Sequence, residues 1–303
     1  MKYSNWLDEW VTYYVKPITK ERTFKKYIRQ IENHIAPQLG NLELEELSAQ
    51  VLQKFTVELT NKGLAPNTVN SIVSVLKASI KRAAVLGVTN VQCTDAIVRP
   101  KGKEKQVECF TKEEQRKIEQ YIADSKKDKL FGILLCLYTG LRIGELLALT
   151  WQDIDFTKGV MSITKSCHDK WKDGQYVKAV DTPKTENAYR IVPIPKPLLA
   201  RMRDRKKRSE CKYVIDGKSE HGAEVRSYQR TFEMLLVKLG ISHKGFHALR
   251  HTFATRALEV GMDIKTLSEI LGHSNPTITL KRYAHSMLEH KTEMMNRVGK
   301  LLL

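Results

Sequence analysis

The chain has no closely spaced cysteine pair. Its cysteines are odd in number and stand far apart: Cys93, Cys109, Cys136, Cys167 and Cys211. Zinc ribbons and disulfide frameworks both show cysteines at regular, close spacings. The sequence therefore favours neither a zinc-binding module nor a disulfide-stabilised scaffold.

Long apolar runs are missing as well. The longest fall well short of the ~18 residues that a membrane-spanning helix needs. Residues 1–15 include Asp8, Glu9 and two tryptophans, a composition unlike that of a secretory signal peptide. We therefore expect a cytoplasmic protein without a membrane partner.

Acidic residues are too few to balance the basic ones. Lys and Arg number 51 against 34 Asp and Glu, which gives a net charge of +17. A field of this sign concentrates polyanions, so nucleic acid is the leading candidate partner. A basic protein with no polyanionic ligand remains the alternative at this point.

The length of 303 residues suggests two domains. Residues 1–98 show helical periodicity only, with Ser48 and Pro66 at positions typical of helix starts. They predict a small helical bundle with a basic face. Candidate DNA-binding residues on that face are Lys25, Lys26, Arg29, Lys77 and Lys81.

The second domain is expected to be mixed. Residues 99–107 are charged and contain Pro100 and Gly102, as interdomain linkers often do. Residues 108–303 open with a helix capped by Thr111 and Glu114. Strands are expected at 160–164, 176–180 and 189–194, with a turn at 182–187 and helices afterwards. The whole chain is thus expected to be mainly α with a small antiparallel β-sheet (α+β).

Basic side chains and one tyrosine recur in short segments of the second domain. The candidate catalytic residues are Arg142, Lys184, His247, Arg250, His273 and Tyr283. Arginine grips phosphate oxygens with two nitrogens, and two arginines can neutralise the charge of a phosphoryl-transfer transition state. The backbone N–H groups that follow Gly140 are expected to add an anion-binding helix start.

Each of these residues also has an ordinary structural explanation. Arg142 could form an ion pair with Glu145, and Lys184 could be a solvated lysine on a polar turn. Tyr283 could be a core or surface residue of an amphipathic helix. As a set, the residues supply phosphate binding, proton transfer and a nucleophile. The basic residues are needed for the last of these, since a tyrosine hydroxyl becomes reactive only beside positive charge or a base.

The order and spacing of the segments resemble the catalytic signature of the tyrosine recombinase (phage integrase) family. The pattern is T-G-L-R-x-x-E, a lysine on a predicted β-turn, H-x-L-R-H-T, L-G-H, and a tyrosine ten residues after that histidine. Residues 1–98 also resemble the core-binding helical bundle of the family. The resemblance covers nearly the whole chain.

The resemblance implies a phosphate-binding role for three residues and a supporting role for a fourth. Arg142 and Arg250 would clamp the scissile phosphate of DNA, and His273 would donate a further hydrogen bond to it. Glu145 matches an acidic position of the family and would support these side chains from behind.

The resemblance also implies a path for protons. His247 would accept the proton of Tyr283, and Lys184 would protonate the departing 5′ oxygen. The attack would leave a 3′-phosphotyrosine and a free 5′ hydroxyl. Because the phosphotyrosine link retains the bond energy, rejoining would need neither ATP nor a metal, and no cofactor is expected.

Double-stranded DNA is the partner that the resemblance implies. It also implies self-association on DNA, as a tetramer in the synaptic complex, with DNA-bending or directionality proteins as further partners. Residues 286–303 resemble the C-terminal tail that docks on a neighbouring protomer. A helix packed on its own domain is the alternative for this segment.

Other functions stay open on the sequence alone. Residues 263–283 are also compatible with the helix-turn-helix of a non-catalytic regulator. His247 and His251 share a helical face, as in some metal hydrolases, although no acidic residue lies between them. A type IB topoisomerase would use similar chemistry.

Two roles compete within the family. The helical bundle begins almost at Met1, without the extra N-terminal arm-binding domain of many integrases, which favours a chromosome-dimer resolvase. The lysine turn at 181–185 and the long segment at 165–180 look more like integrases of Gram-positive mobile elements. We favour the integrase.

Overall fold

The computed structural model describes residues 1–102, 107–125, 127–172, 175–181, 189–217 and 222–273, with positions 277, 292, 295–296 and 298–300. The chain divides into two compact units, Met1–Lys105 and Gln106–Leu303. Residues 103–106 of the expected linker lie outside the described ranges. None of the helices in the described ranges is both long enough and apolar enough to cross a membrane.

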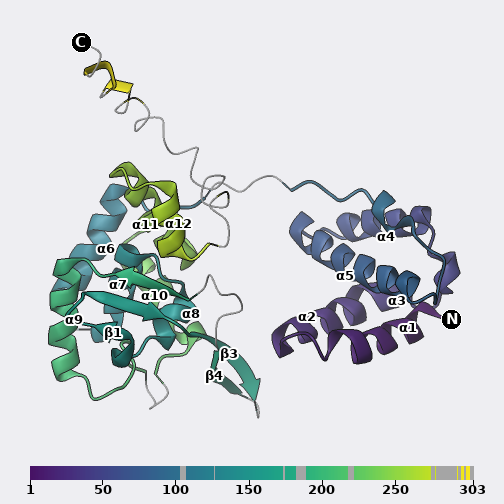
Figure 1. Ribbon diagram of the computed structural model, residues 1–303, viewed down its shortest axis with the longest axis horizontal. Helices are drawn as coiled ribbons and strands as arrows, with labels where there is room; N and C mark the ends of the chain where they lie inside the picture. The colour runs from purple at the N-terminus through teal and green to yellow at the C-terminus, as the bar shows by residue number, and fades with distance from the viewer. Residues whose placement is uncertain are drawn as a thin grey trace. The chain divides into compact units, whose positions relative to one another are not determined.

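The first unit is built from helices (Figure 1). Its α-helices are α1 (Tyr3–Trp10), α2 (Glu21–Gln30), α3 (Ala36–Leu39), α4 (Ala49–Asn61) and α5 (Pro66–Val85). π-helical turns, η1 (Val11–Val15) and η2 (Ile31–Ile35), extend α1 and α2. Short 3-10 turns lie at Leu44–Glu46 and Cys93–Ala96.

Local signals set the ends of α4 and α5. The Ser48 side chain accepts a hydrogen bond from the Val51 N–H and caps α4, as the sequence predicts. Pro66 occupies the first turn of α5, where its missing N–H costs nothing. Both predicted helix starts are confirmed.

A buried polar contact joins α1 to α5. Tyr3 is fully buried, and its hydroxyl lies 2.6 Å from Ser79 Oγ. Ser79 Oγ donates in turn to the Leu76 carbonyl at 2.9 Å, and Trp6 Nε1 donates to the Ser79 carbonyl at 3.0 Å. These bonds fix the register of the two helices within a mainly apolar core.

The second unit combines helices with two small sheets. Its helices are α6 (Lys112–Asp124), α7 (Phe131–Thr139), α8 (Ile143–Ala148), α9 (Lys196–Arg208), α10 (Val225–Lys238), α11 (His247–Glu259) and α12 (Ile264–Leu271), with 3-10 turns η5 (Asp128–Leu130) and η6 (Trp151–Asp153). The predicted Thr111–Glu114 capping box at the start of α6 is confirmed. Buried α7 lies against α11, so the segments that carry Arg142 and Arg250 meet in the core.

The strands form two antiparallel sheets. β1 (Ile154–Asp155), β2 (Val160–Ile163) and β5 (Arg190–Pro193) make one sheet in the order β1-β2-β5. β3 (Ser166–Lys172) and β4 (Gln175–Asp181) make a two-stranded ribbon that projects from the body of the unit (Figure 1). The α+β fold class and the three expected strands are confirmed.

The prediction of a single sheet is wrong, because β4 pairs with β3, a strand that the sequence pattern does not reveal. This strand is mostly polar, with the sequence Ser-Cys-His-Asp-Lys-Trp-Lys, and lacks the run of β-branched residues that marks a strand. It pairs with β4, with Cys167 opposite Val180. Its pairing therefore depends on a partner strand and not on its own propensity.

Ser79→Ala should lower the free energy of unfolding by about 1–3 kcal/mol, because it leaves the buried Tyr3 hydroxyl without its partner. Urea denaturation followed by tryptophan fluorescence measures this loss. The double variant Tyr3→Phe/Ser79→Ala removes both polar groups and should recover part of it. Equal stability of Ser79→Ala and the wild type would contradict the prediction.

Candidate active site

A left-handed glycine places Arg142 at the surface of the second unit. Gly140 ends α7 with φ +66°. A Cβ at Gly140 would lie 2.6 Å from Phe253 Cδ1 and 2.7 Å from Leu271 Cδ2, so both backbone angle and space require glycine. Two residues later, Arg142 is the N-cap of α8.

Arg142 and Glu145 form an ion pair at the start of α8. Arg142 Nη1 lies 2.7 Å from Glu145 Oε1, and the Arg142 side chain is still 39% exposed. The Arg142 backbone N–H donates to Glu145 Oε2 at 2.9 Å. The expectation of an anion-binding helix start after Gly140 is therefore wrong for this N–H, because a carboxylate of the chain already binds it.

A second arginine, which no sequence motif marks, holds Glu145 from the other side. Arg190 Nη1 and Nη2 lie 3.0 Å and 2.8 Å from Glu145 Oε1 and Oε2. Both side chains are buried, 5% exposed for Arg190 and 6% for Glu145. Burial raises the pKa of the Glu145 carboxyl, but the hydrogen bond and charge of Arg190 and the charge of Arg142 outweigh burial and lower the pKa to about 2. Glu145 is therefore ionised at neutral pH.

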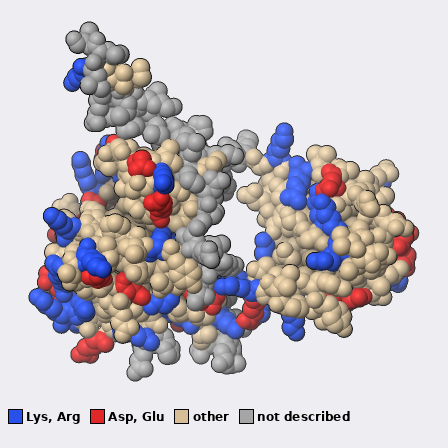
Figure 2. All heavy atoms as spheres, viewed as in Figure 1, with Lys and Arg blue, Asp and Glu red and all other residues tan. Residues whose placement is uncertain are grey.

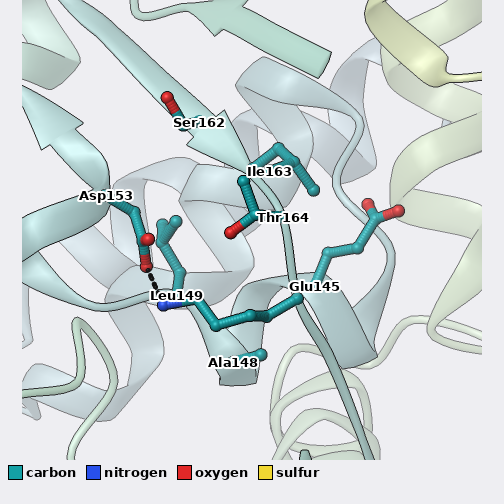
Figure 3. Close-up of a pocket in the computed structure, with 8 residues that line it drawn as sticks. Glu145, Ala148, Leu149, Asp153, Ser162, Ile163 and Thr164 are labelled. Atoms are coloured by element: carbon teal, nitrogen blue, oxygen red, sulfur yellow. Dashed lines mark ion pairs between the residues drawn. The ribbon is translucent and has the colours of Figure 1, made fainter. Parts of the chain in front are cut away.

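A shallow hollow lies between α8, η6 and β2 (Figure 3). On one side, Asp153 Oδ2 binds Lys165 Nζ at 2.9 Å and the Thr150 hydroxyl at 2.6 Å. Figure 3 shows the Glu145 carboxylate extending away from Asp153, on the far side of the hollow. Glu145 thus forms ion pairs with the two arginines, and Asp153 forms one with Lys165.

Arg250 joins three elements. It lies on α11, one turn after His247, and is only 2% exposed. Its Nη1 donates to the Gly140 carbonyl at 2.8 Å, and its Nη2 donates to the Leu271 carbonyl at 2.6 Å. The His247 ring packs edge-on against His251, with ring centroids 4.6 Å apart.

Three arginines converge on the C-terminal end of α12. The successive carbonyls of residues 270–272 accept hydrogen bonds from Arg190 at 2.6 Å, Arg250 at 2.6 Å and Arg142 at 3.3 Å. The C-terminus of a helix carries partial negative charge, which suits cationic partners. His273 is the next residue. The structure thus brings together Arg142, Arg250 and the start of the segment that leads to the predicted nucleophile.

Other predicted site residues lie outside the described ranges. These are Lys184, Tyr283 and most of the tail at 286–303. Their roles stay predictions.

The predicted DNA-binding residues lie on α2 and α5 of the first unit. On α5, Lys77 and Lys81 both form an ion pair with Asp95. Each Nζ lies 3.0 Å from Asp95 Oδ1. On α2, Lys25 pairs with Glu21 at 3.0 Å. Figure 2 shows Lys and Arg side chains on the surface of both units. The exposed basic residues of α2 are Arg22, Lys25, Lys26 and Arg29, and they include all three that were predicted there.

Glu145→Gln should lower the free energy of unfolding at neutral pH by roughly 3–5 kcal/mol, because it leaves Arg190 buried beside an uncharged partner. Since the folded-state pKa of Glu145 is depressed, the carboxylate contributes above its ordinary pKa of about 4.3 and loses its contribution as the pH falls towards 2. The difference in the free energy of unfolding between the variant and the wild type should therefore become smaller at acidic pH.

Urea denaturation over a pH series measures this gap. Glu21→Gln, which removes a half-exposed partner of Lys25, is the matched control and should cost no more than about 1 kcal/mol. A gap for Glu145→Gln that stays constant down to the acid limit would contradict the assignment.

Comparison with known proteins places these observations in a family. Residues 108–290 match the phage integrase family, and residues 2–60 match the N-terminal SAM-like domain of phage integrases. A tyrosine recombinase XerC-like protein of Caldanaerobacter subterraneus is 30% identical, over 97% of this chain and 82% of that protein. The ICEBs1 integrase of Bacillus subtilis is 28% identical, over 92% of this chain and 77% of that protein.

Solved structures share the fold. The integrase of transposon Tn1549, in complex with a circular intermediate DNA, is similar with a TM-score of 0.82 at 23% identity, over 98% of this chain and 99% of that one. A λ integrase tetramer bound to a Holliday junction has a TM-score of 0.68 at 21% identity, over 91% of this chain and 79% of that one. Because the family match covers more than half of the sequence and the Caldanaerobacter relative aligns with nearly all of it, the chain belongs to the phage integrase family of tyrosine recombinases.

Proposed function

We propose that the protein is a site-specific DNA recombinase of a mobile genetic element. It cuts and rejoins DNA through a 3′-phosphotyrosine on Tyr283. The observation that carries the proposal is the convergence of Arg142 and Arg250 on the end of α12, directly before His273. Family membership and the ICEBs1 integrase support the same function.

The two arginines bind the scissile phosphate. Their guanidinium groups carry fixed positive charge and donate several hydrogen bonds, which suits the oxygens of a phosphodiester. They are held in place before the reaction by carbonyls of the protein, so little reorganisation is needed as negative charge develops. His273 adds one hydrogen bond to the same phosphate.

Tyr283 is the nucleophile. His247 takes the phenolic proton as the Tyr283 oxygen bonds to phosphorus. The bond from phosphorus to the 5′ oxygen breaks, and Lys184 protonates that oxygen. Attack by another 5′ hydroxyl reverses these steps on a new strand, so neither ATP nor a metal enters the reaction.

The proposed substrate is double-stranded DNA, bound by an assembly of several copies. Structures of the same fold contain an integrase on a circular intermediate DNA and an integrase tetramer on a Holliday junction. We propose a tetramer in the synaptic complex, joined by the tails at 286–303. DNA-bending and directionality proteins are proposed as further partners.

Resolution of chromosome dimers is the second candidate role, supported by the likeness to a XerC-like recombinase. The strands of the projecting β3–β4 ribbon lie within or next to the long segment at 165–180, and this supports the integrase. Joining of a plasmid that carries the ends of the element to a target plasmid distinguishes an integrase from a resolvase that acts only on dimer sites.

Tyr283→Phe should abolish the covalent protein–DNA adduct and leave DNA binding intact. The probe is a pool of duplexes with a randomised core and a nick, which lets the cleaved fragment leave and traps the adduct on a denaturing gel. Sequencing of the trapped DNA yields a defined duplex for later assays. An adduct formed by Tyr283→Phe would contradict the assignment. Equal DNA binding by the wild type and Tyr283→Phe, with no adduct from either protein, would indicate a non-catalytic regulator.

Asp95→Asn should tighten binding to duplex DNA, because Asp95 competes with phosphate for Lys77 and Lys81. The double variant Lys77→Gln/Lys81→Gln should weaken binding. It should also reduce the slope of log affinity against log salt by about 0.9 for each phosphate that the two lysines neutralise in the wild type. Fluorescence anisotropy with a mixed-sequence duplex measures both.

Asp8→Asn removes an exposed carboxylate from α1 of the same unit and is the matched control for net charge. If Asp95→Asn and Asp8→Asn bind DNA equally well, the lysine pair of α5 does not contact DNA.

A further inference from the structure

Arg190 is a buried arginine that the proposed chemistry does not use. It opens β5, pairs across the sheet with Ile163, and so sits on a hydrogen-bonded strand. Its two Nη atoms bind the two oxygens of Glu145, and its Nε donates to the Ile270 carbonyl. All three nitrogens therefore bond to protein groups, on α8 and on α12.

Arg142 binds the same carboxylate but lies in a different environment. Its side chain is 39% exposed, against 5% for Arg190. Glu145 Oε1 accepts from Arg142 at 2.7 Å and from Arg190 at 3.0 Å. An exposed guanidinium is thus held by a carboxylate that a buried guanidinium holds in turn.

Without Arg190, Glu145 would keep its bonds to the side chain and backbone N–H of Arg142 and lose the two bonds that hold its carboxylate from β5. The Arg142 side chain is 39% exposed and long, so a carboxylate that can turn leaves it several rotamers. The planar fork of Arg190 binds both carboxylate oxygens at once and fixes the plane of the carboxylate. The direction in which Oε1 meets Arg142 follows from that plane.

We propose that Arg190 is a positioning residue for DNA cleavage: through Glu145, it fixes the guanidinium of Arg142 against the scissile phosphate. The proposal rests on the recombinase function proposed above. A catalytic group displaced by about 1 Å can cost about 100-fold in rate, so loss of the Arg190 fork should slow cleavage without touching the DNA contacts.

A second buried arginine provides the matched control. Arg205 on α9 is 7% exposed and pairs with Asp128 at 2.6 Å, apart from the Glu145 network. Arg190→Met and Arg205→Met each remove a buried guanidinium from the second unit. Both should lower the free energy of unfolding, so stability alone does not separate them.

The rate of adduct formation separates the two variants. With the duplex recovered by trapping, single-turnover cleavage by Arg190→Met should fall by about 100-fold, while its DNA affinity stays near that of the wild type. Arg205→Met should cleave at the wild-type rate. Arg190→Lys keeps the charge but cannot span both oxygens of Glu145, so it should fold well and cleave at an intermediate rate.

A modified substrate tests whether the effect passes through Arg142. A methylphosphonate at the scissile position replaces one charged oxygen by a methyl group, so less negative charge needs neutralising. The gap between wild type and Arg190→Met should shrink on this substrate, as should the gap for Arg142→Gln. Lys184→Ala, which affects protonation of the 5′ oxygen, should keep its full defect.

Two results would overturn the positioning role alone: cleavage by Arg190→Met at the rate of Arg205→Met, or an undiminished Arg190→Met defect on the methylphosphonate. Failure of the wild-type protein to form an adduct with any duplex of the pool would overturn the recombinase function and this proposal together.

Discussion

The Glu145 carboxylate is the group on which the site depends. A carboxylate buried this deeply is costly unless opposite charge and hydrogen bonds surround it. Arg190 supplies both from one side, and Arg142 completes the shell from the other. Because Arg190 also binds the end of α12, the same ion pair joins α8, β5 and α12 into one rigid corner.

The charge of this corner supports the proposed phosphate site. Arg142, Arg190 and Arg250 stand against one carboxylate and the weak negative end of α12. In the proposed function, an incoming phosphodiester would meet these fixed positive charges, which would stabilise the additional negative charge of the transition state.

Local signals in the sequence predicted much of this fold. Contacts between segments that are distant in the sequence could not be predicted in this way. Ser48 and Thr111 cap helices through bonds to residues three positions away, so a short window contains the whole interaction. β3 and Arg190 depend on partners elsewhere, since Arg190 meets Glu145 across 45 positions. Arg142, Arg250 and His273 were found through a family pattern, and their shared helix end appeared only in three dimensions.

The Glu145–Arg190 pair is better explained by the orientation it gives to the Glu145 carboxylate than by a gain in the stability of the fold. An apolar pair of similar volume often stabilises a core as well as a buried ion pair does, or better. Apolar contacts, however, have no preferred angle, whereas a bidentate guanidinium fixes the plane of a carboxylate. In the proposed function, Arg142 must point at one phosphorus atom, and a fixed carboxylate plane would help it to do so. The cost of burying the charges of Glu145 and Arg190 is thus consistent with a role in orienting Arg142. This role would give Arg190 a function that needs no contact with DNA.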